Sequence, residues 1–172
     1  MLDSVGFSRV AEAHGILHFL SRLVAMRDVV RPVLRQHGAL STKFEADNAF
    51  AVFDAPDEAI AASLAIHRAV DAHSLMLTES EPFRVCIGVG YGQMLYSETL
   101  EGYFGEEMNL ASKLGEDTAD GGETLVTDNA YRNASQDMVS AFEPREITVS
   151  RVDVRYWCAR HPLDEQNSLA AR

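Results

Sequence analysis

The sequence predicts an α+β fold in which a mostly antiparallel sheet packs against helices, as in ferredoxin-like sandwiches. β-prone runs alternate with amphipathic helical segments along a chain of 172 residues, which is long enough for one domain with a sizeable core. Two further observations favour this class: a predicted hairpin over residues 39–53, and strand candidates that return after the last helix. We therefore expect the helices to cover one face of the sheet.

The composition, with 47% hydrophobic residues, is that of an ordinary soluble globular protein. The net charge of -11 opposes nonspecific binding to DNA, RNA or anionic membrane surfaces. No basic cluster in the sequence offsets this charge, so we expect neither nucleic acid nor membrane as a partner. An acidic protein still binds a nucleoside triphosphate when Mg²⁺ supplies the positive charge.

No apolar run approaches the roughly 20 residues that a membrane-spanning helix needs. The first residues also lack the basic-then-apolar pattern of a signal peptide, because the acidic Asp3 comes first. We therefore expect a cytoplasmic location. The two cysteines, Cys86 and Cys158, lie in apolar, strand-like runs, which favours buried free thiols over a disulfide.

The first part of the chain predicts a short strand near Asp3, a turn at Gly6 and a helix capped by Ser8. A long amphipathic helix is expected over residues 16–34, with a kink or a last short turn at Pro32. Its apolar residues recur at helical spacing: Ile16, Phe19, Leu20, Leu23, Val24, Val30, Val33 and Leu34.

The second part of the chain begins with a helix opened by Pro56. A strand over residues 83–92 carries glycines at alternate positions, which indicates that another element packs closely on it. The remaining expected elements are a helix over 106–119, a strand over 123–127, a minor helix over 128–134 and strands over 147–149 and 154–159. Together these elements predict one domain over residues 1–161, followed by a polar tail over 162–172.

The predicted hairpin holds Asp47 rigidly at its tip. Its strands, residues 39–45 and 49–53, are separated by Ala46-Asp47-Asn48, and Asn and Asp side chains bond back to nearby backbone in such turns. Lys43 lies four residues before Asp47. Alone, this pattern is typical of an ordinary turn, so a functional interpretation needs partners elsewhere in the chain.

Those partners are found in four motifs that occur in order along the chain: Asp3-x-x-Gly6-Phe7-Ser8, Lys43-x-x-x-Asp47, Tyr103-Phe104-Gly105 and Asn109-Leu110-Ala111-Ser112-Lys113-Leu114. In order and approximate spacing, this set resembles the catalytic domain of class III adenylate/guanylate cyclases. The resemblance covers about residues 1–159, which is nearly the whole chain.

The resemblance implies a head-to-tail homodimer with active sites at the interface. By motif position, Asp3 and Asp47 of one subunit would hold two Mg²⁺ or Mn²⁺ ions. Two clamped ions stabilise the attacking 3′-oxygen and the departing pyrophosphate, which explains why this chemistry needs both carboxylates. The backbone amides near Gly6, Phe7 and Ser8 would receive the triphosphate, because unpaired amides at a helix start favour anions.

The other subunit, by the same resemblance, supplies the remaining residues. Lys43 matches the lysine that reads the purine, and Asn109 matches the asparagine that orients the ribose. Lys113 stands where most members carry an arginine that stabilises charge in the transition state. Gly102 stands where an aspartate often accepts from the adenine amino group, and the adjacent Glu101 is a candidate substitute. Lys43 favours ATP over GTP as the substrate.

Three departures from the family pattern keep a second interpretation open. Lys113 keeps a positive charge but lacks the planar fork of arginine, Gly102 carries no acceptor, and only Met1 and Leu2 precede Asp3. The first strand is therefore expected to be clipped, with either a start further upstream or a frayed end at Asp3. The alternative to an active cyclase is a noncatalytic module that dimerises or binds nucleotides. A third interpretation is an α+β ligand-binding domain in which the acidic turn residues are coincidental.

Overall fold

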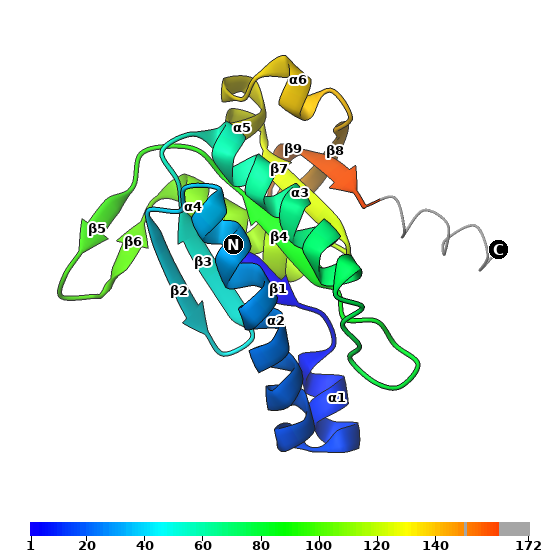
Figure 1. Ribbon diagram of the computed structural model, residues 1–172. Coiled ribbons are helices and arrows are strands. Elements are labelled where there is room, and N and C mark those ends of the chain that lie inside the picture. Colours follow the sequence, from blue (N-terminus) through cyan, green and yellow to red (C-terminus); the bar gives the residue numbers. More distant parts are fainter. Residues whose placement is uncertain (150, 162–172) are drawn as a thin grey trace.

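A computed structural model describes residues 1–149 and 151–161 of the chain. Within them, a seven-stranded sheet carries helices on both faces, and a separate two-stranded hairpin projects from one side (Figure 1). The elements, in chain order, are β1 (Leu2–Ser4), α1 (Phe7–His14), α2 (Ile16–Gln36), β2 (Ser41–Glu45), β3 (Asn48–Val52), α3 (Pro56–Ala72), β4 (Val85–Val89), β5 (Leu95–Ser97), β6 (Gly102–Phe104), α4 (Glu106–Ser112), the π-helix η1 (Lys113–Thr118), β7 (Glu123–Thr127), α5 (Asp128–Asn133), α6 (Gln136–Val139), β8 (Glu143–Val149) and β9 (Val152–Arg160).

The large sheet has the strand order β2-β3-β1-β4-β7-β9-β8. Every neighbouring pair is antiparallel except β4 and β7, which run parallel. This arrangement confirms the predicted α+β class with a mostly antiparallel sheet. The parallel pair requires a long crossover between β4 and β7, and that crossover carries β5, β6, α4 and η1.

Helices cover both faces of the sheet, and not one face as the sequence analysis expects. The main core lies under α2 and α3 and includes Phe19, Met26 and Ile60, each with 0% of its surface exposed. A smaller core on the other face joins Leu114 of η1 to strands β7 and β9. The glycines of β4 permit the second layer, because a Cβ added at Gly88 would lie 2.0 Å from the carbonyl oxygen of Ala111 in α4.

The first two predicted helices need one correction each. Helix α1 begins at Phe7 with Gly6 as its N-cap, so Ser8 is not the cap. Gly6 has a φ of 88°, a left-handed conformation that glycine adopts without strain. Helix α2 runs from Ile16 to Gln36 and continues through Pro32. Three of its predicted apolar residues are exposed, because the first turns of α2 project with α1 beyond the sheet (Figure 1): Ile16, Leu20 and Val24.

The carboxyl-terminal half follows the predicted order with longer strands and an altered helix. The helix expected over 106–119 is α-helical only to Ser112 and continues as η1. Thr127 caps α5 by accepting a hydrogen bond from the amide of Ala130 at 3.1 Å. The predicted tail, residues 162–172, lies outside the described residues. Both cysteines are buried and free, as predicted. No helix in the described ranges is long and apolar enough to cross a membrane.

Candidate active site

Strand β1 positions Asp3 in the middle of the sheet, next to the β2–β3 hairpin. Leu2 pairs with Ala49 of β3 on one side, and Asp3 pairs with Cys86 of β4 on the other. The hairpin register pairs Glu45 with Asn48, so Ala46 and Asp47 form its two-residue turn. Asp47 therefore lies two residues before the residue that pairs with Leu2, so one predicted metal-binding aspartate lies on β1 and the other in the turn that leads into the neighbouring strand β3.

The carboxylate of Asp47 is close enough to raise the pKa of Asp3. Burial raises the pKa of Asp3 from 3.8 to about 6, and the charge of Asp47 is the next largest cause. Glu116 of η1 adds a smaller effect in the same direction, while the amide of Ser4 donates to the carboxylate and lowers the pKa. The pKa of Glu116 is itself raised, by burial first, then by Asp117 and Asp47. A bound cation would relieve this repulsion.

The donor set suits a hard divalent ion that also binds substrate. Within the described part of the chain, no group of three or more His, Cys, Asp or Glu side chains could hold a metal ion. Mg²⁺ commonly takes one or two carboxylates together with substrate phosphates and water, so Asp3 and Asp47 fit this ion class. The Oδ1 atom of Asn48 is a buried oxygen with no hydrogen-bond partner among these residues. Continuing the β1–β3 register from Leu2 and Ala49 sets Asn48 opposite Asp3.

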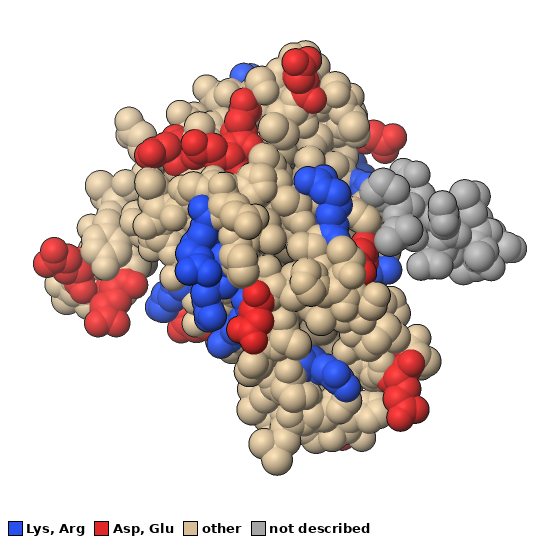
Figure 2. Space-filling model, viewed as in Figure 1, with Lys and Arg blue, Asp and Glu red and all other residues tan. Residues whose placement is uncertain are grey.

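Arginines of α2 brace the hairpin that carries Asp47. The guanidinium groups of Arg27 and Arg31 lie 5.3 and 5.1 Å from the ring centroid of Phe44, and Arg27 also donates to the carbonyl oxygen of Ala46. Figure 2 shows basic side chains gathered over α2 and β2 on this face. The turn residue Ala46 is held at a φ of 47°, so these contacts stabilise a conformation that alanine rarely adopts.

The start of α1 offers free backbone donors near β1. Helix α1 has no side-chain N-cap and no acidic residue in its first turn. The amides of Phe7 and Ser8 belong to that first turn, where intrahelical partners are missing. Amides of this kind favour anions, and the binding of the triphosphate at Gly6, Phe7 and Ser8 stays a prediction.

The remaining predicted residues lie elsewhere on the molecule. Lys43 is exposed on β2 and forms an ion pair with Glu45 at 3.1 Å. Asn109 is exposed on α4, and Gly102 is the first residue of β6. Lys113, at the junction of α4 and η1, forms an ion pair with Asp117 at 2.6 Å.

Within one chain, the predicted metal-binding aspartates are therefore not joined to Asn109 and Lys113, the predicted ribose and phosphate residues. Among the described residues, no hydrogen bond or ion pair connects Asn109 or Lys113 to Asp3 or Asp47. Sequence reasoning missed Glu116, which only the packing of η1 brings into electrostatic reach of Asp3. It also missed the partner of Lys113, although the four-residue spacing to Asp117 was a usable signal.

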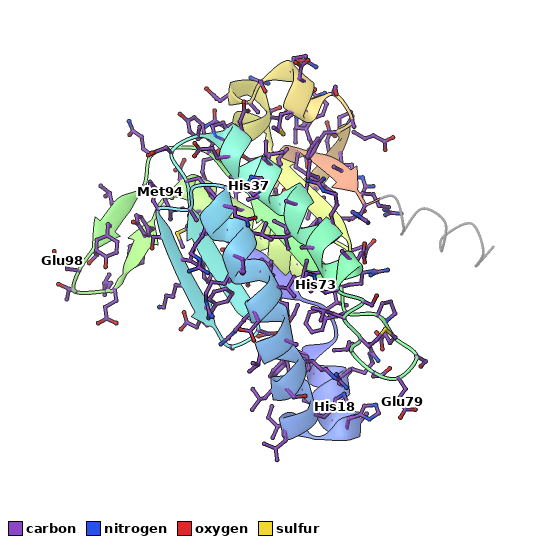
Figure 3. All side chains as sticks on the ribbon, in the orientation of Figure 1. His18, His37, His73, Glu79, Met94 and Glu98 are labelled. Atoms are coloured by element: carbon purple, nitrogen blue, oxygen red, sulfur yellow. The ribbon has the colours of Figure 1, made fainter. Side chains whose placement is uncertain are left out.

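A projecting arm, formed by the β5–β6 hairpin, exposes large apolar side chains. Leu95 is 78% exposed, Leu100 is 67% exposed and Tyr96 is 58% exposed. Figure 3 places Glu98 at the tip of the arm and Met94 at its base. Exposed apolar residues gathered on a projection are typical of protein–protein contact surfaces.

Solved cyclase structures share this fold across nearly the whole chain. The adenylate/guanylate cyclase/hydrolase from Silicibacter pomeroyi is 24% identical, with a TM-score of 0.75 and 94% of each chain covered. An adenylate cyclase from Trypanosoma brucei, solved in its monomeric state, is 18% identical with a TM-score of 0.70, covering 94% of this chain and 86% of that one. The catalytic core of a rhodopsin-guanylyl cyclase with converted specificity, in complex with ATPαS, is 16% identical with a TM-score of 0.73, covering 92% of each chain.

The sequence itself matches no family model and no curated protein. The likeness is therefore one of three-dimensional structure, and it extends over the sheet, the hairpin and the helices described above. This chain has the fold of adenylate/guanylate cyclase catalytic domains.

Proposed function

We propose that the chain is a class III nucleotidyl cyclase that converts ATP to 3′,5′-cyclic AMP and pyrophosphate. The observation that carries this proposal is the pair Asp3, on β1, and Asp47, in the turn before the neighbouring strand β3, close enough for the charge of Asp47 to raise the pKa of Asp3. The cyclase fold supports it, and so does the complex of a rhodopsin-guanylyl cyclase core with ATPαS.

In this proposal, Asp3 and Asp47 bind two Mg²⁺ or Mn²⁺ ions. When bound, the ions supply charge stabilisation for the attacking 3′-oxygen and the departing pyrophosphate. The amides of Gly6, Phe7 and Ser8 bind the triphosphate, since the first turn of α1 has no competing acidic side chain.

A second copy of the chain completes each site, because the remaining residues do not join the aspartates within one chain. From the second copy, Lys43 donates to an acceptor at the purine edge, and Asn109 orients the ribose. Lys113 places a positive charge near the reacting phosphate once Asp117 releases it. The exposed apolar residues of the β5–β6 arm support a partner at this surface.

The test is a cyclase assay with purified protein, Mn²⁺ and either ATP or GTP. Cyclic AMP is expected from ATP, with specific activity that rises with protein concentration as the dimer forms. Asp47→Ala should abolish the product, whereas Asp137→Ala, an exposed aspartate on α6, should not change it. Equal product from wild type and Asp47→Ala would contradict the assignment, and so would full specific activity in a strictly monomeric sample.

A catalytically degenerate module that dimerises or binds nucleotides is the second candidate. It is favoured by the ion pair that neutralises Lys113 at 2.6 Å, and by Gly102, which offers no side-chain acceptor to the base. Calorimetry with ATP and Mn²⁺ separates the two proposals. Nucleotide binding without turnover favours the noncatalytic module. If neither binding nor turnover is detected, both nucleotide proposals for this chain are contradicted.

A further inference from the structure

The first turns of α2 carry an apolar stripe that faces solvent. Leu17 is 80% exposed, Val24 is 58% exposed, Ile16 is 49% exposed and Leu20 is 45% exposed. Residues three, four and seven apart lie on one side of a helix, so these four side chains form one continuous surface, the α2 stripe. Single exposed apolar residues are ordinary, but a contiguous apolar surface is typical of a contact with another molecule.

The α2 stripe lies on a side of the helix that neither the sheet nor α1 covers. The opposite side holds Phe19 and Leu23, which belong to the main core, and the ring of Phe7 from α1 packs on Phe19 at 4.6 Å between centroids. Figure 3 places His18, from the same turns, at the outer end of the molecule. The residues around Met1 lie at the end of β1 remote from α1, so the exposure of the stripe is independent of them.

The same side of α2 changes from apolar to charged in its second half. Asp28 follows Val24 by one turn, Arg31 and Arg35 follow at helical spacing, and Arg31 lies 3.9 Å from Asp28. The start of α2 has no acidic residue in its first turn and no side-chain cap, so its free amides leave a partial positive charge there. The amino end of α2 therefore favours an acidic neighbour.

A second copy of the chain satisfies both halves of this side when the two α2 helices run antiparallel. With a two-fold axis near Leu20, Leu17 of each copy faces Val24 of the other. At this register, Asp28 of each copy lies beside the positive amino end of the other α2, which is an attraction. A parallel pair would instead bring Arg31 and Arg35 of both copies together, and these like charges repel. Charge therefore selects the antiparallel arrangement.

The area of the α2 stripe suits a weak, reversible dimer. Its four side chains expose roughly 400 Å² per copy, so a symmetric pair would bury roughly 800 Å² of apolar surface. Specific interfaces usually bury about 1,200–2,000 Å² in total, and the polar residues beside the stripe bring the pair to the low end of this range. We propose that the α2 stripe joins two copies of this chain through antiparallel α2 helices, with a dissociation constant of roughly 10–100 μM. This contact uses none of the predicted cyclase residues.

Sedimentation equilibrium at about 200 μM protein tests the contact. Leu17→Glu places a charge in the stripe, and the control Val152→Glu makes the same kind of change at a residue of β9 that is 62% exposed. The weight-average mass of Leu17→Glu should be at least about 1.5-fold below that of the wild type and of Val152→Glu. Equal masses of the three proteins overturn the proposal. The fall is expected whether or not a head-to-tail dimer also forms and whether or not cyclic AMP is made, so this proposal and the proposed function fail separately.

Disulfide trapping tests the antiparallel register, with the wild type as control because Cys86 and Cys158 are buried. Leu20→Cys should form dimers on oxidation with copper phenanthroline. Leu17→Cys mixed with Val24→Cys should form them at least about fivefold faster than either variant alone, because facing residues come within disulfide distance while identical ones lie roughly 10 Å apart along the axis. Faster trapping of each variant alone would mean parallel helices, and it overturns the proposal, as does the absence of trapping. Wild-type binding to anionic phospholipid vesicles without self-association would make the stripe a membrane contact and also overturn it.

Discussion

Replacing Asp3 by asparagine should stabilise the protein at neutral pH and leave it unchanged in acid. The pKa of Asp3 is raised from 3.8 to about 6 in the folded protein, by burial first and by Asp47 second. Below pH 3.8 the carboxyl group is protonated in both the folded and the unfolded states. As the pH rises toward 6, only the unfolded state releases the proton, so folding stability is lost across this window.

A shift of about two pH units corresponds to roughly 3 kcal/mol at 1.36 kcal/mol per unit. Because Asp3 is only half buried and keeps part of its hydration, we expect Asp3→Asn to recover about 1–2 kcal/mol at pH 7.5. For a domain of this size, that gain raises the Tm by roughly 2–8 °C. Thermal melts at pH 7.5 and pH 3.5 measure it. A variant that is less stable at pH 7.5, or equally shifted at both pH values, would refute the argument.

Adding Mn²⁺ at pH 7.5 should stabilise the wild type more than Asp3→Asn. The ion relieves the repulsion between Asp3 and Asp47, so it raises the Tm of the wild type more than that of Asp3→Asn. An exposed control, Asp137→Asn, should respond to Mn²⁺ like the wild type. If Mn²⁺ raised the Tm of all three proteins equally, Asp3 would not be a ligand.

Three further changes follow from single contacts. Gly88→Ala should prevent folding or lower the Tm sharply, because its Cβ would lie 2.0 Å from the carbonyl oxygen of Ala111. The control Gly102→Ala, whose Cβ would have its nearest neighbours at 3.7 Å, should melt like the wild type when unfolding is followed by circular dichroism. Asp117→Asn should free Lys113 and tighten ATP binding about twofold to fivefold in calorimetry; weaker binding would contradict the proposed role of Lys113. Burial, and then His161, lower the pKa of His67 to about 3, so the folded wild type should lose stability as the pH falls from 6.5 toward 3. In thermal melts over this range, the Tm of His67→Gln should depend less on pH than the Tm of the wild type. Parallel pH profiles of the two proteins would argue against this titration.

Much of the fold was predictable because local pattern and final packing agree. The hairpin around Asp47 follows from its turn chemistry, and the alternate glycines Gly88, in β4, and Gly90, just after it, correctly indicated a close neighbour. The exposed apolar residues of α2 were not predictable, since helical spacing cannot tell whether a helix extends past the sheet it covers. The β5–β6 arm was missed because its strands have only three residues each and contribute little to either core.

The candidate site was predictable in part, through the motifs around Asp3 and Asp47 and not through any rule of spacing. Their proximity depends on β1 pairing with β3, a long-range choice that no local pattern encodes. Glu116 could not be predicted, because its approach to Asp3 depends on η1 packing against the other face of the sheet. The roles of Lys43, Asn109, Lys113 and Gly102 stay predictions until the assays above are done.

The parallel pairing of β4 with β7 has an evolutionary consequence. It forces residues 90–122 to leave the sheet and return, and this single excursion carries Gly102, Asn109 and Lys113. Under the proposed function, the contacts of Asn109 and Lys113 with the ribose and the reacting phosphate would therefore vary through insertions or substitutions in this one surface segment, while β1 and the β2–β3 hairpin, which carry the acidic pair and Lys43, stay fixed. In a lineage with this topology, those contacts would change without any change in the sheet that carries the acidic pair.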